Sequence, residues 1–257
     1  MLLTIDVGNT QIALGMFDGD DLIGHWRVST DPIATFDEMR WELTGILETD
    51  GFSQEDILGL SVSSVVPALT TTIRKIAPRV VSGSVVVVEP GIRTGLSIEI
   101  DNPREVGADR IVNSVAARAR YGSPVVVVDF GTSTNFDVVG PTGAYLGGAI
   151  APGLEIATNA LVSGTAALRR VEFQPPRSVI GKGTVEAIQS GAIFGHAGLV
   201  DGITERIVAE FDEDVTTVAT GGLASTIVPH CSSVDIVDSY LTLEGLRILF
   251  EMNQDQA

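Results

Sequence analysis

The chain has 257 residues, 33 of them acidic and 16 lysine or arginine, so its formal charge is −17. A surface this negative repels nucleic-acid phosphates and anionic lipid heads, so neither a nucleic acid nor a membrane surface is expected as a partner. Hydrophobic residues make up 44% of the chain, which excludes a disordered protein, because disordered segments lack the apolar surface that offsets chain entropy.

Cysteine usage and the N-terminal sequence indicate the cellular compartment. The single cysteine, Cys231, has no intramolecular disulfide partner. The start of the chain reaches Asp6 without the basic segment of a signal peptide, and apolar runs such as 125–128 are far shorter than the ~20 residues of a membrane helix. We therefore expect a cytoplasmic protein that does not enter a membrane.

The first half of the chain reads as three strands followed by alternating helices and strands. The Asp-Gly-Asp break at 18–20 is typical of a hairpin. A capping box at 35–38, followed by apolar residues at helical spacing, predicts a helix. In chain order, we expect strands at 2–7, 11–17 and 22–28, a helix at 36–49, a strand at 57–65, a helix at 68–76, a strand at 84–89 and a helix at 107–121.

The second half begins with the same pattern. Tyr121-Gly122-Ser123-Pro124 interrupts the chain, and three more β-type runs follow it. The expected elements are strands at 125–129, 134–139 and 145–150, a helix at 184–209, strands at 217–220 and 234–237 and a helix at 242–252. The class is therefore α/β with mixed sheets and flanking helices.

An internal repeat is visible at the level of single residues. Ile-Asp-Val-Gly-Asn-Thr at 5–10 matches Val-Asp-Phe-Gly-Thr-Ser at 128–133, at an offset of 123 residues. Each copy is followed by a strand and a glycine-containing turn, with Gly19 in the first copy and Gly143 in the second. Duplication of one unit is the simplest interpretation, so we predict two domains, residues 1–120 and 121–257.

The two repeated turns have the chemistry of phosphate binding. Each places an aspartate, Asp6 or Asp129, at the end of a buried strand and follows it with a glycine and small polar residues. Backbone N–H groups in such a turn hold phosphate oxygens, while the carboxylate orients a hydrated Mg²⁺. A single turn of this kind is more often a plain hairpin, but two copies at equivalent positions favour a nucleotide held between two lobes.

Other glycine-containing segments are less specific. Thr220-Gly221-Gly222 follows a strand and suits a base or ribose lying against the backbone, although a simple helix-start turn explains it as well. The segment 180–184, Ile-Gly-Lys-Gly-Thr, lacks the glycine spacing of a P-loop. Neither segment establishes a site by itself.

Asp109 and Arg110 lie where a polar segment enters a strongly apolar helix. The helix dipole favours a carboxylate in this first turn. An ionised Asp109 could accept a proton from a hydroxyl while the neighbouring guanidinium holds an acidic substrate. The alternative, a helix-terminal aspartate beside a solvated arginine, remains open on these residues alone.

Together the motifs resemble one family. They are Asp-Val-Gly-Asn-Thr at 6–10, Asp-Asn-Pro-Arg-Glu-Val-Gly-Ala-Asp-Arg at 101–110 and Asp-Phe-Gly-Thr at 129–132. In this order and spacing they look like type III pantothenate kinases, members of the acetate and sugar kinase/Hsp70/actin superfamily, and the resemblance covers essentially the whole chain. It implies two duplicated ribonuclease-H-like (actin-like ATPase) domains and a homodimer.

The resemblance also implies a reaction and roles for residues. The reaction is ATP-dependent phosphorylation of pantothenate, the first step of coenzyme A biosynthesis, with Asp109 as proton acceptor. The implied ATP-binding residues are Asp6, Val7, Gly8, Asn9, Thr10, Gln11, Ile12, Ala13 and Thr132, with Asp6 near the Mg²⁺ that accompanies ATP. The implied pantothenate contacts are Ile100, Gly107, Ala108, Asp109, Arg110 and Thr184, and Asp129 is implied to bind a monovalent cation, K⁺ or NH4⁺.

The sequence departs from the family at two places. Position 100, aromatic in many members, is Ile100 here, and Ser133-Thr134-Asn135 replaces a frequent Ala-Thr-Thr. Two other functions stay open: a regulatory or accessory protein of the same fold without turnover, and a kinase of another small hydroxy acid. The presence of Asp6, Asp109 and Asp129 argues against the first.

Overall fold

The structure is a computed structural model, and it describes residues 1–256. By its internal contacts the chain divides into two compact units, which we describe separately. The first unit contains residues 1–96, 102–116 and those from Leu241 onward, and the second contains residues 97–101 and 117–240. The helix α3 (Ala108–Tyr121) therefore contributes residues to both units.

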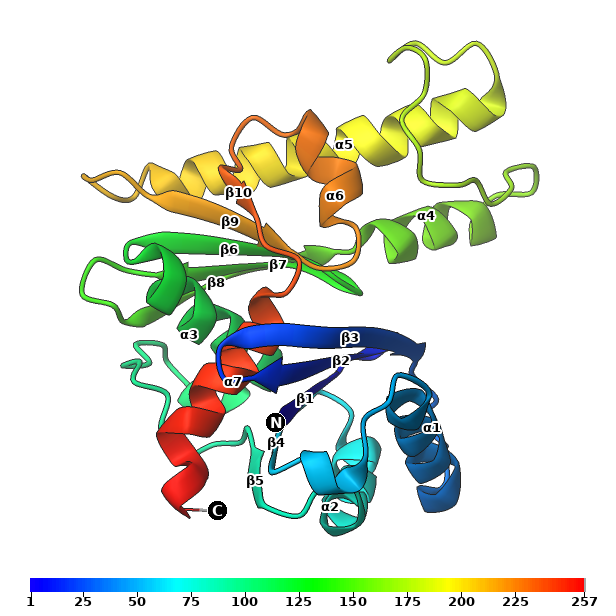
Figure 1. Cartoon of the computed structure of the whole chain (residues 1–257). Coiled ribbons are helices and arrows are strands. Elements are labelled where there is room, and N and C mark those ends of the chain that lie inside the picture. The colour runs from blue at the N-terminus through cyan, green and yellow to red at the C-terminus, as the bar shows by residue number, and fades with distance from the viewer. Residues whose placement is uncertain (257) are drawn as a thin grey trace. The chain divides into compact units, whose positions relative to one another are not determined.

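The first unit is built on a five-stranded sheet in the order β3-β2-β1-β4-β5 (Figure 1). β1 pairs antiparallel with β2 and parallel with β4. Its elements are β1 (Leu2–Val7), β2 (Gln11–Asp18), β3 (Asp21–Ser29), α1 (Phe36–Thr49), β4 (Gly59–Ser64), α2 (Pro67–Val80), β5 (Ser84–Val87) and α7 (Leu241–Asn253).

Along β1, successive side chains point to opposite faces of the sheet, and different helices cover the two faces. Leu3, Ile5 and Val7 are buried in the core that α1 and α2 complete. The intervening side chains point to the opposite face, where α7 packs against β1 and β4 (Figure 1). Asp6 therefore belongs to the face of the sheet that α7 covers.

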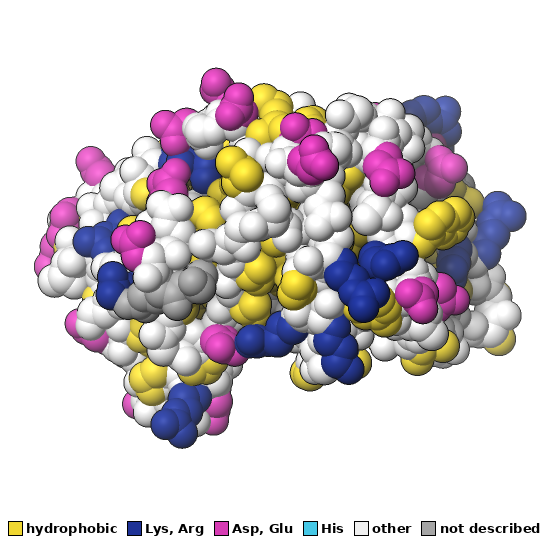
Figure 2. All heavy atoms as spheres, turned by 60° about the horizontal axis from the view of Figure 1, so that its bottom comes forward, with side chains coloured by type: hydrophobic (Ala, Val, Ile, Leu, Met, Phe, Trp, Pro, Cys, Tyr) yellow, Lys and Arg dark blue, Asp and Glu magenta, His cyan; other side chains and the backbone are white. Residues whose placement is uncertain are grey.

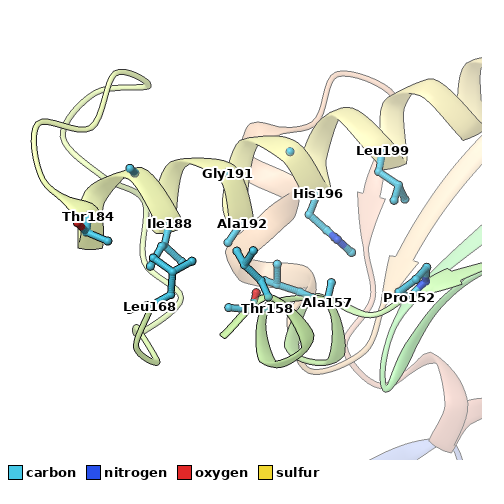
Figure 3. A pocket seen from close by; sticks show the side chains of 14 residues that line it. Pro152, Ala157, Thr158, Leu168, Thr184, Ile188, Gly191, Ala192, His196 and Leu199 are labelled. Atoms are coloured by element: carbon cyan, nitrogen blue, oxygen red, sulfur yellow. The ribbon is translucent and has the colours of Figure 1, made fainter. Parts of the chain in front are cut away.

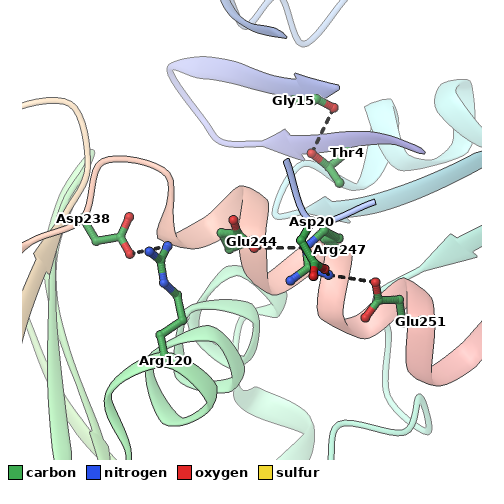
Figure 4. A network of polar contacts seen from close by, with 8 residues as sticks. All are labelled: Thr4, Gly15, Asp20, Arg120, Asp238, Glu244, Arg247 and Glu251. Atoms are coloured by element: carbon green, nitrogen blue, oxygen red, sulfur yellow. Dashed lines mark hydrogen bonds and ion pairs between the residues drawn. The ribbon is translucent and has the colours of Figure 1, made fainter. Parts of the chain in front are cut away.

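Polar contacts hold α7 to the first unit. The Arg247 guanidinium binds Asp20 at 2.6 Å, Glu244 at 3.1 Å and Glu251 at 2.7 Å (Figure 4). At the C-terminal end of the helix, the Asn253 side chain donates a hydrogen bond to the Arg93 carbonyl oxygen at 2.9 Å and accepts one from the Arg93 N–H at 3.0 Å. α7 thus covers one face of a sheet whose strands all come from the first 87 residues.

The second unit repeats the arrangement with a sheet in the order β10-β9-β6-β7-β8. Each strand takes the place of its counterpart in the first sheet, β6 standing for β1 and β9 for β4. Its elements are β6 (Val125–Phe130), β7 (Ser133–Val139), β8 (Tyr145–Pro152), α4 (Leu154–Ser163), α5 (Thr184–Val208), β9 (Thr216–Thr220), α6 (Ala224–Ile227) and β10 (Ile236–Val237). The duplication predicted from the sequence is confirmed as two sheets of one topology.

The cores of the two units match as well. Val126, Val128 and Phe130 on β6 are buried with residues of α4, α5 and α6, and each lies 123 residues after a buried residue of β1. Asp129 accordingly points to the other face, as Asp6 does in the first sheet. Within the second unit, Asp238 accepts a hydrogen bond from Arg120 at 2.8 Å (Figure 4). It accepts another from the Tyr121 hydroxyl at 2.7 Å.

The sequence-based element boundaries differ from the structure at a few places. The helix expected at 68–76 extends over Pro67–Val80, and the strand expected at 234–237 is only Ile236–Val237. No helix is predicted from the sequence at α4, whose Ile156 and Leu161 are about half exposed, at 48% and 47%. Exposed apolar residues obscure the periodicity that reveals a helix with one buried face.

Candidate active site

The first repeated turn joins β1 to β2 through three residues. The Gly8 N–H donates a hydrogen bond to the Gln11 carbonyl oxygen at 3.0 Å. Thr30, just after β3, braces the turn: its hydroxyl donates to the Gly8 carbonyl oxygen at 2.7 Å and its N–H to that of Thr10 at 2.9 Å. Asn9, Thr10 and Gln11 are exposed, so the turn presents small polar groups to a ligand.

The second repeated turn joins β6 to β7 and is one residue tighter. The Gly131 N–H donates to the Ser133 carbonyl oxygen at 3.0 Å, and the Ser133 hydroxyl donates to Oδ1 of Asn135 at 2.9 Å. Gly153 lies against this turn, because a β-carbon there would stand 2.3 Å from the Thr132 carbonyl oxygen. The segment 147–153, which contains three glycines, therefore packs against the turn that carries Thr132.

The aspartates that precede the turns are held from a neighbouring strand. On β4, the Ser63 hydroxyl donates a short hydrogen bond to Oδ1 of Asp6. In the second unit, Gly221 follows β9 with φ +94°, and a β-carbon there would lie 2.6 Å from Oδ1 of Asp129. Ser63 could not be identified from the sequence, because its partner lies 57 residues away along the chain.

Asp109 lies in the first turn of α3, where its carboxylate is partly buried. Burial raises the pKa of Asp109, and the Arg110 N–H, which donates to Oδ1 at 2.9 Å, and the Arg110 charge counteract this in part. A β-carbon on Gly107 would lie 2.5 Å from the same oxygen. A carboxylate with a raised pKa is a better proton acceptor near neutral pH.

A groove of about 520 Å³ runs between α4 and α5 in the second unit (Figure 3). Thr184, the first residue of α5, lies at one end of it, and the remaining lining is largely apolar. His196 reaches from the groove to Thr134 on β7, with 2.8 Å between Nε2 and Oγ1, and burial lowers its pKa. The groove is thus connected to the strand that follows the second turn.

The predicted site residues are distributed between the two units. Asp6–Ala13 and Gly107–Arg110 belong to the first unit, and Ile100, Asp129, Thr132 and Thr184 belong to the second. Ile100 lies in a segment that pairs with β8 through Ile98 and Tyr145, and it packs beside Gly147, where a β-carbon would stand 3.4 Å from Cγ2 of Ile100.

Surface charge does not explain how this protein would attract an anion. Acidic side chains, in magenta, are distributed over the face in Figure 2, and the basic ones lie among them without forming a continuous band. Within residues 1–256, no group of three or more His, Cys, Asp or Glu side chains is placed to hold a metal ion, and no helix is long and apolar enough to cross a membrane. The net charge of −17 opposes the approach of a phosphate, and backbone N–H groups in the two turns are candidates to bind one locally.

Solved structures with the same arrangement define the fold class. The chain is similar to an inorganic polyphosphate/ATP-glucomannokinase from Arthrobacter sp. strain KM, with 16% identity, 98% of each chain covered and a TM-score of 0.53. It is also similar to a structure described as a Baf family transcriptional activator from Campylobacter jejuni, with 18% identity, coverage of 98% of this chain and 99% of the other, and a TM-score of 0.61. The fold is that of the sugar kinases and actin-like ATPases, two ribonuclease-H-like domains.

Sequence comparison identifies the family within this class. The profile of type III pantothenate kinase matches residues 2–206. A type III pantothenate kinase from Frankia alni is 54% identical over 98% of this chain and 100% of its own length, and one from Streptomyces griseus is 48% identical with both chains fully covered. The chain belongs to the type III pantothenate kinase family.

Proposed function

We propose that this protein transfers the terminal phosphoryl group of ATP to pantothenate, giving 4′-phosphopantothenate in the first step of coenzyme A biosynthesis, with Asp109 as the general base. Family membership over the full length carries the reaction. The role of Asp109 as general base is supported by its partly buried carboxylate at the start of α3. Because ATP is a cytoplasmic substrate, we also propose that the protein is cytoplasmic.

Asp109 accepts the proton of the pantothenate hydroxyl as that oxygen attacks the phosphorus. The Arg110 N–H fixes one carboxylate oxygen at 2.9 Å, so the carboxylate keeps one orientation. Phosphoryl transfer depends mostly on positioning and on charge stabilisation, which makes a single oriented base sufficient for the acceptor side. Gly107 leaves the space that this orientation requires.

The acceptor is an acid, and cationic and small residues surround its proposed site. Arg110 attracts the pantothenate carboxylate, and Gly107 and Ala108 let the substrate approach the start of α3. We assign Thr184 and Ile100 to the same substrate, with Ile100 supplying an aliphatic wall where relatives have an aromatic one. Thr184 is exposed at the first turn of α5, where its hydroxyl is accessible to a ligand.

The nucleotide phosphates bind along the first turn, residues Asp6 to Ala13, with Thr132 contributing from the second turn. The donor chemistry of Asp6 suits Mg²⁺, which prefers oxygen ligands and is usually held by one or two carboxylates together with substrate phosphates. A site of this kind needs no cluster of three protein ligands, in keeping with the residues that the structure describes. When bound, Mg²⁺ neutralises charge on the phosphates. The chain itself orients the Asp6 carboxylate through Ser63.

Asp129 is the proposed ligand of a monovalent cation, K⁺ or NH4⁺. Its carboxylate offers hard oxygen donors, and Gly221 packs so closely beside Oδ1 that a β-carbon there would lie 2.6 Å from it. Asp129 lies at the end of β6, three residues before Thr132 of the second turn.

We further propose that the protein is a homodimer whose interface is the face formed by α4 and α5. Ile156 and Leu161 of α4 are half exposed, and the groove between the helices is largely apolar. Gly191, Gly195 and Gly198 of α5 have nothing within 4 Å of an added β-carbon, so a second copy can approach the helix closely. Light scattering should give a dimer for the wild-type protein and a monomer for Gly195→Arg; a monomeric wild-type protein would contradict the interface.

The test of the reaction is ADP release by the purified protein. ADP should form only when pantothenate, Mg²⁺-ATP and K⁺ or NH4⁺ are all present, and Na⁺ should not replace K⁺. Asp109→Asn should lose roughly 10²- to 10⁴-fold in kcat, the usual contribution of a general base, while Asp101→Asn, an exposed aspartate of the preceding segment, serves as matched control. Phosphorylation of other hydroxy acids, with no response to pantothenate, would show that the acceptor is a different acid. Full activity of Asp109→Asn would contradict the general-base role of Asp109.

A further inference from the structure

The two aspartates that precede the repeated turns have equivalent neighbours. On the parallel pair β1 and β4, Asp6 lies in register with Ser63. On the equivalent pair β6 and β9, Asp129 lies in register with Thr220. Side chains at paired positions of neighbouring strands point to the same face of a sheet. In each unit a hydroxyl residue therefore stands beside the aspartate.

Both hydroxyl residues are removed from solvent. Ser63 is 0% exposed and Thr220 is 1% exposed. Most buried hydroxyls are hydrogen-bonded inside the protein, and the Ser63 hydroxyl has the Asp6 carboxylate as its acceptor. A hydrogen bond from a hydroxyl to a carboxylate is charge-assisted and stronger than one between neutral groups, so it holds the carboxylate in one rotamer.

Ser61 shows that this bond is not a packing requirement of the strand. It lies two residues before Ser63 on β4, so the two side chains share a face, and it is equally buried. Within residues 1–256, its hydroxyl has no hydrogen-bond partner. The strand thus tolerates a buried serine without a partner, and only the serine opposite Asp6 engages a carboxylate.

In the second unit, the end of β9 lies against Asp129. Thr220 is the last residue of β9, and Gly221 directly after it packs on the Asp129 carboxylate and the backbone of Phe130. Two features therefore position Asp129: the sheet register, which sets Thr220 beside it, and the close approach of Gly221.

We propose that Ser63 and Thr220 are positioning residues, Ser63 for the aspartate at the nucleotide and its metal, and Thr220 for the aspartate at the monovalent cation. The proposal rests on the proposed function. Residues that hold a metal-binding side chain in place typically change metal affinity or activity by about 10- to 100-fold when they are removed. The neighbouring strand thereby supplies each half of the enzyme with one orienting hydroxyl.

Calorimetry of Mg²⁺-ATP binding without pantothenate tests Ser63. Ser63→Ala should weaken binding about 10- to 100-fold and shift the Mg²⁺ concentration for half-maximal binding upward, while Ser63→Thr, which keeps the hydroxyl, should restore both. Ser61→Ala is the matched control and should bind as the wild type does. In kinetic assays Ser63→Ala should raise KM for ATP with little change in KM for pantothenate. Wild-type binding by Ser63→Ala, or an equal loss in Ser61→Ala, would overturn the role of Ser63.

Thermal denaturation in KCl and in NaCl tests Thr220. K⁺ should raise the midpoint of the wild-type protein above its value in Na⁺, and Thr220→Val should lose that difference while Thr220→Ser keeps it. Thr204→Val is the control, since the Thr204 hydroxyl on α5 is also buried and has no hydrogen-bond partner in residues 1–256. A K⁺ response that survives in Thr220→Val would overturn its role. Both readouts are independent of turnover, so a wild-type protein that binds Mg²⁺-ATP but ignores pantothenate would contradict the proposed reaction and leave these comparisons decisive.

Discussion

A β-carbon on residue 107 would lie 2.5 Å from Oδ1 of Asp109, so Gly107 gives the carboxylate the space that it occupies. We predict that Gly107→Ala displaces the carboxylate and lowers kcat by about 10²-fold, the effect of a misplacement near 1 Å. Calorimetric affinity for Mg²⁺-ATP should stay unchanged, because the first turn is not altered.

Gly45→Ala is the matched control for this substitution. Gly45 lies inside α1, and nothing lies within 4 Å of an added β-carbon. Alanine there should leave kcat unchanged and raise the free energy of unfolding by roughly 0.5–1 kcal/mol, since alanine favours a helix over glycine. Equal kcat values for Gly107→Ala and Gly45→Ala would show that the contact at Asp109 has no catalytic consequence.

Burial raises the pKa of Asp109, so its ionised form is disfavoured in the folded state. The contribution of this group to stability is fully present below the unfolded-state pKa, about 3.9, and is lost as the pH rises through the folded-state pKa. Asp109→Asn carries no such charge. Its free energy of unfolding should therefore exceed that of the wild type at pH 7, and the advantage should shrink below pH 4.

Urea denaturation between pH 3 and pH 8 measures this difference. Asp101→Asn, a change at an exposed position, controls for the loss of one negative charge from the acidic chain. A wild-type protein that is more stable than Asp109→Asn at pH 7 would contradict the expected destabilisation by the buried charge.

Arg247 is 13% exposed and binds three carboxylates, Glu244 and Glu251 within α7 and Asp20 in the turn between β2 and β3. We expect Arg247→Met to lower the free energy of unfolding by about 1–3 kcal/mol, because the Glu244 carboxylate, which is 16% exposed, loses its charged hydrogen-bond donor. The exposed pair Arg74 and Glu89 is the control: Arg74→Met should change stability by at most about 1 kcal/mol. Similar losses for both variants would refute the difference in burial as the cause.

Gly221 combines a left-handed backbone with close contact to Asp129. Gly221→Ala should cost about 1–2 kcal/mol for its positive φ and additionally weaken the stabilisation by K⁺. Gly51→Ala separates the two effects, because Gly51 has φ +86° but open space around it. Gly51→Ala should lose only the stability that its positive φ costs, with no change in the K⁺ response. Thermal midpoints in KCl and NaCl check this prediction. An unaltered K⁺ response in Gly221→Ala would show that the contact of Gly221 with Asp129 does not affect stabilisation by K⁺.

The features that could be predicted from the sequence are those carried by neighbouring residues. The turns at Gly8 and Gly131 and the capping box at Thr35 are each written within a few positions, and the repeat made their significance visible. Contacts between distant residues could not be predicted in this way. The bond from Ser63 to Asp6 depends on strand register, which no local pattern contains.

The packing of α7 on the first sheet could not be predicted from the sequence for the same reason. Its periodicity predicted a helix at 242–252, and the structure has Leu241–Asn253. That its buried leucines belong to the sheet begun by Leu2–Val7 follows only from contacts that span almost the whole chain. The domain division 1–120 and 121–257 stays a prediction from the repeat, whereas the contacts group the residues from Leu241 onward with the first unit.

This placement of α7 has a consequence for biosynthesis. The ribosome makes β1 long before α7, so the face of the first sheet that α7 covers stays uncovered while the residues between them are synthesised. Domains usually fold in the order of their synthesis. Here the residues of the second unit are all made before Leu241, so that unit can fold before α7 covers one face of the first sheet.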